Sequence, residues 1–120
     1  MTKRVLVVED NELNLKLFCD LLRAHGHEVL PLRDGRDVVA QALAFGPDLV
    51  ITDIHLPHVS GLDLIISLKR DPRLKSVPIM AVTAYAGKGD EDRLRDAGAQ
   101  AYVSKPISVL RFVEQVNALL

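Results

Sequence analysis

The stretch Asp-Leu-Val-Ile-Thr-Asp, residues 48–53, decides the fold, because its uninterrupted apolar centre, residues 49–51, is followed after Thr52 by the acidic Asp53. Such a run is typical of a strand that is buried on both faces, as in a parallel sheet. Two other short apolar runs have the same form, and they lead into Glu9-Asp10 and into Lys105. Ligands of an open α/β sheet bind beyond the carboxyl ends of its strands. We therefore expect these residues and Asp53 to meet in one crevice.

Three carboxylates in that crevice would repel one another. With an effective dielectric constant of ~20, each pair costs on the order of 4 kcal/mol at a separation of ~4 Å. A hard divalent cation is the simplest compensation, and oxygen atoms are the ligands that it prefers. The sequence therefore indicates a divalent cation site at Glu9, Asp10 and Asp53.

Helical patterns separate the apolar runs along the whole chain. The predicted strands are 5–8, 28–32, 48–53, 77–82 and 101–104, and the predicted helices are 12–25, 35–45, 60–70, 90–97 and 108–120. This alternation implies right-handed crossovers and a parallel sheet covered on both faces. The expected fold class is α/β, a five-stranded parallel sheet in a doubly wound, flavodoxin-like three-layer sandwich. With 120 residues, the chain is expected to form a single domain, 1–120, without an output domain.

Apolar spacing assigns an inward face to each predicted helix. In the first helix the expected inward residues are Leu17, Phe18, Leu21 and Leu22. Leu13 and Leu15 lie near opposite edges of that face, so at least one of them should be exposed close to the crevice. In the last helix the expected inward residues are Leu110, Val113, Val116 and Leu120. The helix at 90–97 has Leu94 and Ala97 as nearly its only apolar residues, so it should be the most weakly held.

Composition and charge exclude several classes of function. The chain has 15 basic and 16 acidic residues and a net charge of −1, which gives no electrostatic reason to expect binding to nucleic acid or to an anionic membrane. Cys19 is the single cysteine, so neither a disulfide framework nor a thiolate metal site is expected. The N-terminal apolar run is too short for a signal peptide, and no run approaches the length of a membrane span. We therefore expect a cytoplasmic protein without membrane insertion.

Four sequence blocks resemble the signature blocks of bacterial response-regulator receiver domains. They occur in the order and spacing of that family along the whole chain, at residues 7–11, 51–61, 82–84 and 104–106. The runs 8–14 and 104–109 are most similar to those of single-domain receivers that regulate cell division and polarity. The resemblance implies a receiver fold and a signalling function controlled by phosphorylation.

The resemblance also implies roles for individual residues. Asp53 would be the phosphoacceptor, which attacks a phosphoryl group whose charge is neutralised by its surroundings. Lys105 would supply a positive charge to the phosphoryl group, Thr83 a hydroxyl donor and Ala84 a backbone N–H. The family also implies a cis peptide bond between Lys105 and Pro106.

The same resemblance places Mg²⁺ in the acidic crevice. Its protein ligands would be Glu9, Asp10, Asp53 and the backbone carbonyl of His55. In the family the second acid of the pair binds the ion directly, and the first often acts through water. Such a sparse set of oxygen ligands suits Mg²⁺, which keeps several of its waters.

Two further expectations concern the response to phosphorylation. Thr83 would move toward the phosphoryl group and Tyr102 would turn into the space that it leaves, so these residues are the expected switch. His55 and Tyr85 would flank the path of a hydrolytic water. Neither is an acid or amide suited to orient that water, so we expect slow self-dephosphorylation. The alternative is that neutral His55 acts as a base and accelerates hydrolysis.

The predicted function is that of a single-domain response regulator. It would accept a phosphoryl group on Asp53 from a histidine kinase or phosphotransfer protein and then bind downstream proteins, in control of cell division. It would promote its own phosphorylation and slow dephosphorylation, but it is not expected to be an enzyme that turns over a substrate. A monomer is favoured, and no nucleic acid partner is expected.

Two other functions are compatible with parts of this pattern. A phosphohydrolase of the haloacid dehalogenase type also uses a strand-end aspartate, Mg²⁺, threonine and lysine. Those enzymes have a second acid two residues after the nucleophile, where this chain has His55. A flavodoxin-like nucleotide or flavin binder needs a loop rich in Gly or Ser after the first strand. Here that loop is Asp10-Asn11-Glu12-Leu13, which would repel a phosphate without a metal.

Overall fold

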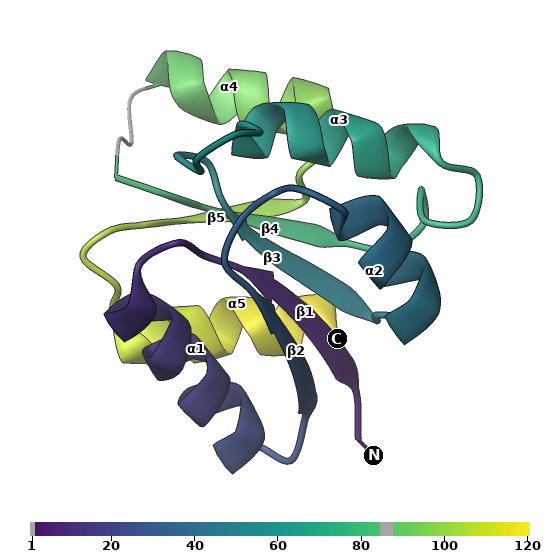
Figure 1. Ribbon diagram of the computed structural model, residues 1–120. Coiled ribbons are helices and arrows are strands. Elements are labelled where there is room, and N and C mark those ends of the chain that lie inside the picture. Colours follow the sequence, from purple (N-terminus) through teal and green to yellow (C-terminus); the bar gives the residue numbers. More distant parts are fainter. Residues whose placement is uncertain (1, 85–87) are drawn as a thin grey trace.

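The computed structural model describes residues 2–84 and 88–120 of the chain. The described chain alternates five strands with five helices, and Figure 1 shows the strands joined in one sheet. The elements are β1 (Arg4–Val8), α1 (Glu12–Ala24), β2 (Glu28–Leu32), α2 (Val38–Phe45), β3 (Leu49–Asp53), α3 (Gly61–Arg70), β4 (Ile79–Thr83), α4 (Lys88–Ala97), β5 (Ala101–Ser104) and α5 (Val109–Leu119). All strand pairs are parallel, in the order β2-β1-β3-β4-β5. The predicted α/β fold class, a doubly wound flavodoxin-like sheet, is confirmed.

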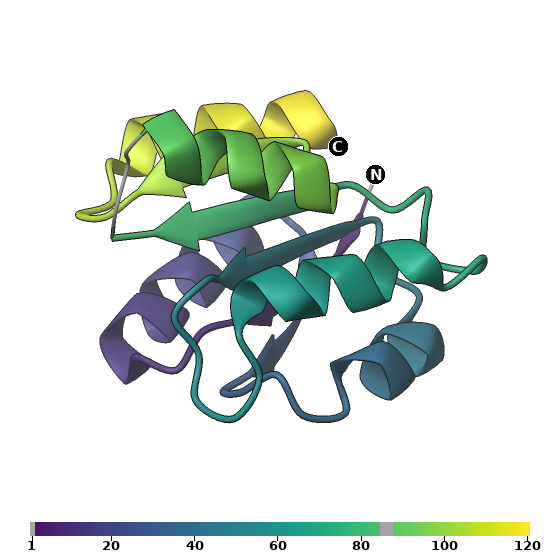
Figure 2. The same ribbon diagram turned by 90° about the horizontal axis from the view of Figure 1, so that it is seen from above.

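Helices cover both faces of the sheet and make it the middle of three layers. In Figures 1 and 2, α1 and α5 lie on one face and α2, α3 and α4 on the other. Alternate strand residues point to opposite faces, so Val5 and Val7 belong to the core with α1 and α5, and Leu6 and Val8 to the other core. Burial on both faces explains the continuous apolar strand sequences. Among the described residues, no helix has the length and apolar character that a membrane crossing requires.

The rotation of α5 is set by a pair of stacked rings. Phe18 of α1 and Phe112 of α5 have ring centroids 4.9 Å apart and planes at 7°, and both side chains are fully buried. Leu110 lies two residues before Phe112, about 200° around the helix. It therefore points outward and is 72% exposed. The prediction that Leu110 faces inward is wrong for this reason.

The inward face of α1 is rotated relative to the predicted one. Its buried residues are Leu15, Phe18, Cys19 and Leu22. Leu17 and Leu21, which were expected at the centre of the face, are only partly buried. Leu13 is 80% exposed, which confirms that at least one of the leucines at positions 13 and 15 remains outside.

Two elements differ from their predicted ranges for local reasons. The helix α2 begins at Val38 rather than at residue 35, because the carboxylate of Asp34 accepts the backbone N–H of Arg36 at 2.8 Å and closes a turn there. The strand β4 covers residues 79–83 rather than 77–82, and Pro78 before it has no N–H to offer to the sheet. The other elements match their predicted ranges to within two residues.

In the stretch 91–97, the helix α4 packs against the core through Leu94 and Ala97, and Glu91 connects it to β5. Leu94 is the buried residue of the stretch 91–97. Glu91 accepts a hydrogen bond from the Tyr102 hydroxyl at 2.9 Å and pairs with Arg95 at 2.7 Å. The contact between Glu91 and Tyr102 therefore ties α4 to β5.

Candidate functional site

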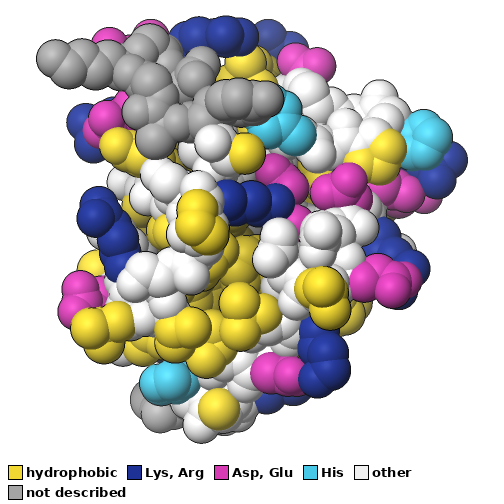
Figure 3. All heavy atoms as spheres, turned by 90° about the vertical axis from the view of Figure 1, so that its left-hand side faces the viewer, with side chains coloured by type: hydrophobic (Ala, Val, Ile, Leu, Met, Phe, Trp, Pro, Cys, Tyr) yellow, Lys and Arg dark blue, Asp and Glu magenta, His cyan; other side chains and the backbone are white. Residues whose placement is uncertain are grey.

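The ends of β1 and β3 bring the predicted acidic residues together at one edge of the sheet. The two strands pair in register, with Val8 opposite Thr52. The residues Glu9, Asp10 and Asp53 therefore offer carboxylate oxygens within 4.8 Å of one another. Figure 3 views this edge, where acidic side chains gather around a hollow that holds a basic side chain. The convergence expected from the strand ends is present.

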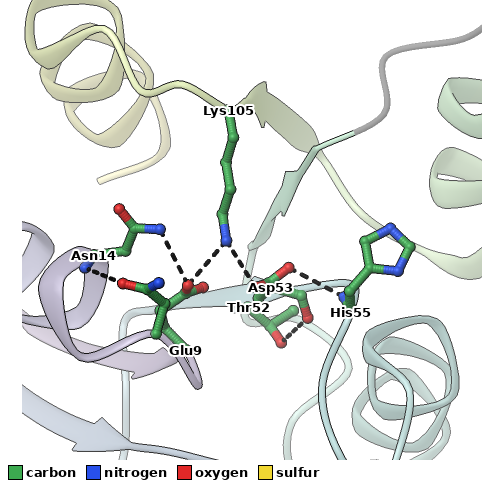
Figure 4. Close-up of polar contacts among 7 residues, drawn as sticks. Glu9, Asn14, Thr52, Asp53, His55 and Lys105 are labelled. Atoms are coloured by element: carbon green, nitrogen blue, oxygen red, sulfur yellow. Dashed lines mark hydrogen bonds and ion pairs between the residues drawn. The ribbon is translucent and has the colours of Figure 1, made fainter.

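Lys105 links two of these carboxylates. Its Nζ donates to Glu9 Oε1 at 2.9 Å and to Asp53 Oδ2 at 2.9 Å (Figure 4). It follows directly after β5, and the Lys105-Pro106 peptide bond is cis, as the resemblance implied. Burial acts to lower the pKa of Lys105, but the two carboxylates outweigh this effect and raise the pKa above its ordinary value. The ammonium group therefore stays charged between the two acids.

Glu9 is the most unusual acid of the group, because its side chain is fully buried. Burial and the neighbouring Asp53 carboxyl raise the pKa of Glu9 from 4.5 to about 7, against the opposing effect of Lys105. The amide of Asn14 lies 3.4 Å from Glu9 Oε1, whereas Oε2 is buried without a hydrogen-bond partner among the described residues. An unpaired buried carboxylate oxygen is costly. A divalent cation between the three acids would supply the missing partner, so the residues present fit such an ion.

Asp53 is held in place by the backbone around it. It is 3% exposed, and its Oδ1 accepts the backbone N–H of His55 at 3.1 Å. The loop after β3 then turns back, and the N–H of Gly61 donates to the Ile54 carbonyl at 2.9 Å. A Cβ atom on Gly61 would lie 2.2 Å from the carbonyl oxygen of Asp53. Gly61 was not predicted as a site residue. The available signal was a glycine directly after the cap residue Ser60, where a close backbone approach favours it.

The predicted residues of β4 and the β3–α3 loop lie at the same edge of the sheet as the acids. Thr83 ends β4 and is 3% exposed, and Ala84 follows it at the surface. The ring of His55 points away from the acids in Figure 4, which argues against a role for the ring as a metal ligand. Together with Thr83, His55 lines a separate cavity of about 240 Å³.

Tyr102 is the predicted residue that lies outside the acidic centre. Its hydroxyl is engaged by Glu91 of α4 at 2.9 Å, and this contact raises the pKa of the Tyr102 hydroxyl above its ordinary value. Tyr85, on which the expected lifetime of a phosphorylated state depends in part, lies outside the described residues.

This arrangement suits a carboxylate that accepts a highly negative electrophile. Asp53 is a weak nucleophile alone, but Lys105 and the cation site beside it can neutralise the negative charge of an incoming group. Thr83, which has a hydroxyl group, ends the neighbouring strand β4.

Sequence comparison relates the chain to one family. The family model of the response regulator receiver domain matches residues 5–117. The polar-differentiation response regulator DivK of Brucella ovis is 52% identical over 120 residues, which are 100% of this chain and 98% of that protein. DivK of Brucella anthropi is 51% identical over 120 residues, with 100% and 98% coverage.

Solved structures share the fold. The chemotaxis response regulator CheY4 of Vibrio cholerae gives a TM-score of 0.94 over 100% of both chains at 22% identity, a likeness of fold alone. The receiver domain of a sensor histidine kinase from Pseudomonas aeruginosa gives a TM-score of 0.89 at 28% identity, over 99% of this chain and 98% of that one. In that structure a magnesium ion is coordinated in the active-site cleft.

Proposed function

The chain belongs to the response regulator receiver domain family, and from this premise we propose that its Asp53 accepts a phosphoryl group from a phosphohistidine of a partner protein. The observation that carries the proposal is the pair of 2.9 Å contacts from Lys105 to Asp53 and Glu9, beside three carboxylates that can share one cation. Positive charge prearranged at the acceptor stabilises the charge of the transferring group.

In this proposal the transfer is a single displacement at phosphorus. A bond forms between a carboxylate oxygen of Asp53 and phosphorus, while the bond from phosphorus to the histidine nitrogen breaks and leaves its electron pair on the imidazole. Lys105 is held between Asp53 and Glu9, so its ammonium group would pair with the phosphoryl oxygens during the transfer. The hydroxyl of Thr83 and the backbone N–H of Ala84 would donate to the other oxygens.

We propose Mg²⁺ as the ion of the acidic centre. Glu9, Asp10 and Asp53, with the backbone carbonyl of His55, would hold it. When bound, it supplies positive charge that neutralises the acids and the phosphoryl oxygens. The magnesium-bound receiver domain from Pseudomonas aeruginosa, 28% identical, supports this choice of ion.

We propose signalling rather than turnover of small phosphate esters. The haloacid dehalogenase alternative finds no support, because the matching family and the curated relatives are response regulators. His55 also occupies the place of the second acid that those phosphohydrolases use. Slow self-dephosphorylation remains part of the proposal.

The relatives suggest the physiological output. The Brucella proteins named DivK are polar-differentiation response regulators, and we propose that this chain likewise acts in cell division and polarity. It would act as a single receiver domain, 1–120, that binds downstream proteins and not nucleic acid. A monomeric state and a cytoplasmic location remain predictions.

The switch formed by Thr83 and Tyr102 also remains a prediction. If Tyr102 turns into the space that Thr83 leaves, its contact with Glu91 at 2.9 Å must break and α4 loses a tie to β5. Nuclear magnetic resonance of the Tyr102 rotamers, with and without the phosphoryl mimic beryllofluoride, tests the prediction. Identical populations in both states would contradict it.

Exposed apolar side chains near the site offer a docking surface for the phosphohistidine partner. Leu13 is 80% exposed, Leu110 is 72% exposed and Val109 is 46% exposed. Leu13 lies in the first turn of α1, which follows Asp10, and the other two begin α5, which follows Lys105. Figure 1 shows α1 and α5 side by side below the sheet. Apolar residues placed here can pack against the helices of a phosphohistidine domain.

Substitution of Leu13 and Leu110 by glutamate is expected to slow phosphotransfer from a phosphorylated histidine phosphotransfer domain at least roughly tenfold, because apolar contacts are lost and unpaired charges enter the interface. Phosphorylation by acetyl phosphate should not change, because it needs no docking surface. Ala44→Glu, on the exposed side of α2, is the matched control and should affect neither rate. Equal losses with both donors would indicate damage to the fold and contradict the docking role.

A further inference from the structure

A groove between α3 and α4 leads away from the proposed phosphorylation site. The two helices lie side by side on one face of the sheet in Figures 1 and 2. Two cavities of about 240 and 410 Å³ lie along them, and Leu62 of α3 and Arg93 of α4 line both cavities. The smaller cavity also reaches His55 and Thr83. We call this continuous feature the α3–α4 groove.

The α3–α4 groove has an apolar floor. Leu62 and Ile66 contribute from α3, and Leu94 and Ala97 contribute from α4. Leu94 is buried, whereas the other three side chains are only partly buried. Their remaining apolar surface is available to a ligand that excludes water from it.

Lys69 fixes α3 against the end of α4. Its stem lies so close to Gly98 that an added Cβ atom there would be 2.6 Å from Lys69 Cγ. Its Nζ donates to the carbonyl oxygens of Lys75 at 3.1 Å and Val77 at 2.8 Å. These bonds hold the Lys69 side chain in place beside Gly98, the residue that follows α4.

The rim of the α3–α4 groove carries two guanidinium groups that form no ion pair with the side chains that the structure describes, those of residues 2–84 and 91–120. They belong to Arg70 and Arg93, both of them exposed. The arginines that do pair with a carboxylate are Arg4, Arg33, Arg36, Arg73 and Arg95. Asp96 is the acidic member of the lining, against Lys69, Arg70 and Arg93. The lining is therefore complementary to an anionic ligand.

We propose that the α3–α4 groove binds a downstream protein through an acidic segment that carries apolar side chains. The apolar side chains would cover the floor, and carboxylates of the segment would pair with Arg70 and Arg93. A phosphate ligand alone would match the arginines but leave the apolar floor exposed to water. Thr83 and His55 line the near end, so phosphorylation of Asp53 would change the affinity of the groove. This coupling rests on the proposed function.

The test uses the full chain and a short synthetic peptide composed of glutamate and leucine. Titration into ¹⁵N-labelled protein, with and without beryllofluoride and Mg²⁺, should shift the amide signals of Leu62, Ile66 and Ala97. The double variant Arg70→Glu, Arg93→Glu should weaken binding roughly tenfold, since attractive pairs become repulsive. Arg23→Glu is the matched control, because Arg23 is exposed on α1 across the sheet and has no ion pair among the described residues. It should leave the affinity unchanged.

Peptides with lysine in place of glutamate, or serine in place of leucine, should not shift the groove signals. Tight binding of the serine peptide, unchanged affinity of the double arginine variant, or no groove shifts at millimolar peptide would overturn the proposal. An affinity that is the same with and without beryllofluoride would overturn the coupling.

Acetyl phosphate treatment of the same proteins separates the proposed groove from the proposed phosphorylation of Asp53. Normal phosphorylation of the double variant without peptide binding supports the groove, whereas peptide binding by a wild type that takes no phosphoryl group refutes only the proposed function.

Discussion

Replacement of Gly61 by alanine is expected to lower the free energy of unfolding by about 3 kcal/mol. The added Cβ would lie 2.2 Å from the carbonyl oxygen of Asp53 and 2.5 Å from the Cα of Ile54. Both are backbone atoms, which cannot swing aside as a flexible side chain would. The end of β3 would have to move, and the carboxylate of Asp53 would move with it. Urea denaturation measures the loss, and any folded fraction should accept a phosphoryl group poorly.

Gly26→Ala provides the matched control for this steric effect. Gly26 has a φ of +84°, and nothing lies within 4 Å of a Cβ atom built on it. The substitution should cost only about 1–2 kcal/mol, which reflects left-handed backbone strain. It should also leave phosphorylation intact, since the position is remote from the site. If Gly61→Ala were as mild as Gly26→Ala, the close approach of the β3–α3 loop to Asp53 would not be essential.

The second large effect is a dependence of metal stabilisation on pH. Mg²⁺ is expected to stabilise the protein much more at about pH 8 than at about pH 5.5. Glu9 has a pKa of about 7 in the folded protein and 4.5 as the ordinary value. The folded state therefore binds more protons between these values. The free energy of unfolding of the metal-free protein should fall as pH rises through this window, by up to about 3 kcal/mol. Mg²⁺ binds the ionised carboxylate and restores about 2.7 kcal/mol at a concentration of 100 times its Kd.

Two variants separate the proton from the metal in this prediction. Glu9→Gln stays neutral at every pH, so the metal-free protein should lose its decline in stability between about pH 5.5 and about pH 8. Asp10→Asn should keep that decline, because it leaves Glu9 in place. It should lose most of the stabilisation by Mg²⁺, because Asp10 is one of the three carboxylates that would hold the ion. Thermal melts at the two pH values give the answer. A Mg²⁺ effect of the same size at both values, or one that persists in Asp10→Asn, would contradict the account.

The strands and their meeting point could be predicted from the sequence because both follow from local patterns. A run such as residues 49–51 is apolar at every position, and this pattern is stable only when both faces are covered. Parallel strands place the residues that follow them at a common edge, so Glu9 and Asp53 were expected to meet, and the pairing of β1 with β3 makes them neighbours. The cis Lys105-Pro106 bond was found only through the family resemblance, since the residues alone favour trans.

Other features depend on distant contacts that no local pattern contains. The exposure of Leu110 follows from the stacking of Phe112 on Phe18, which lies on another helix. The raised pKa of Glu9 requires its burial, which is set by the elements around β1 rather than by its own neighbours in sequence. The need for glycine at position 61 appears only when the β3–α3 loop is seen to fold back onto Asp53.

The central claim is that Asp53 is the phosphoacceptor, and intact mass measurement tests it most directly. The wild type and Asp53→Asn are incubated with Mg²⁺ and acetyl phosphate, and their melting curves confirm that both are folded. The account predicts that the wild type gains the mass of one phosphoryl group and that Asp53→Asn gains none. A wild type that gains no mass, or an Asp53→Asn variant that gains as much as the wild type, would contradict it.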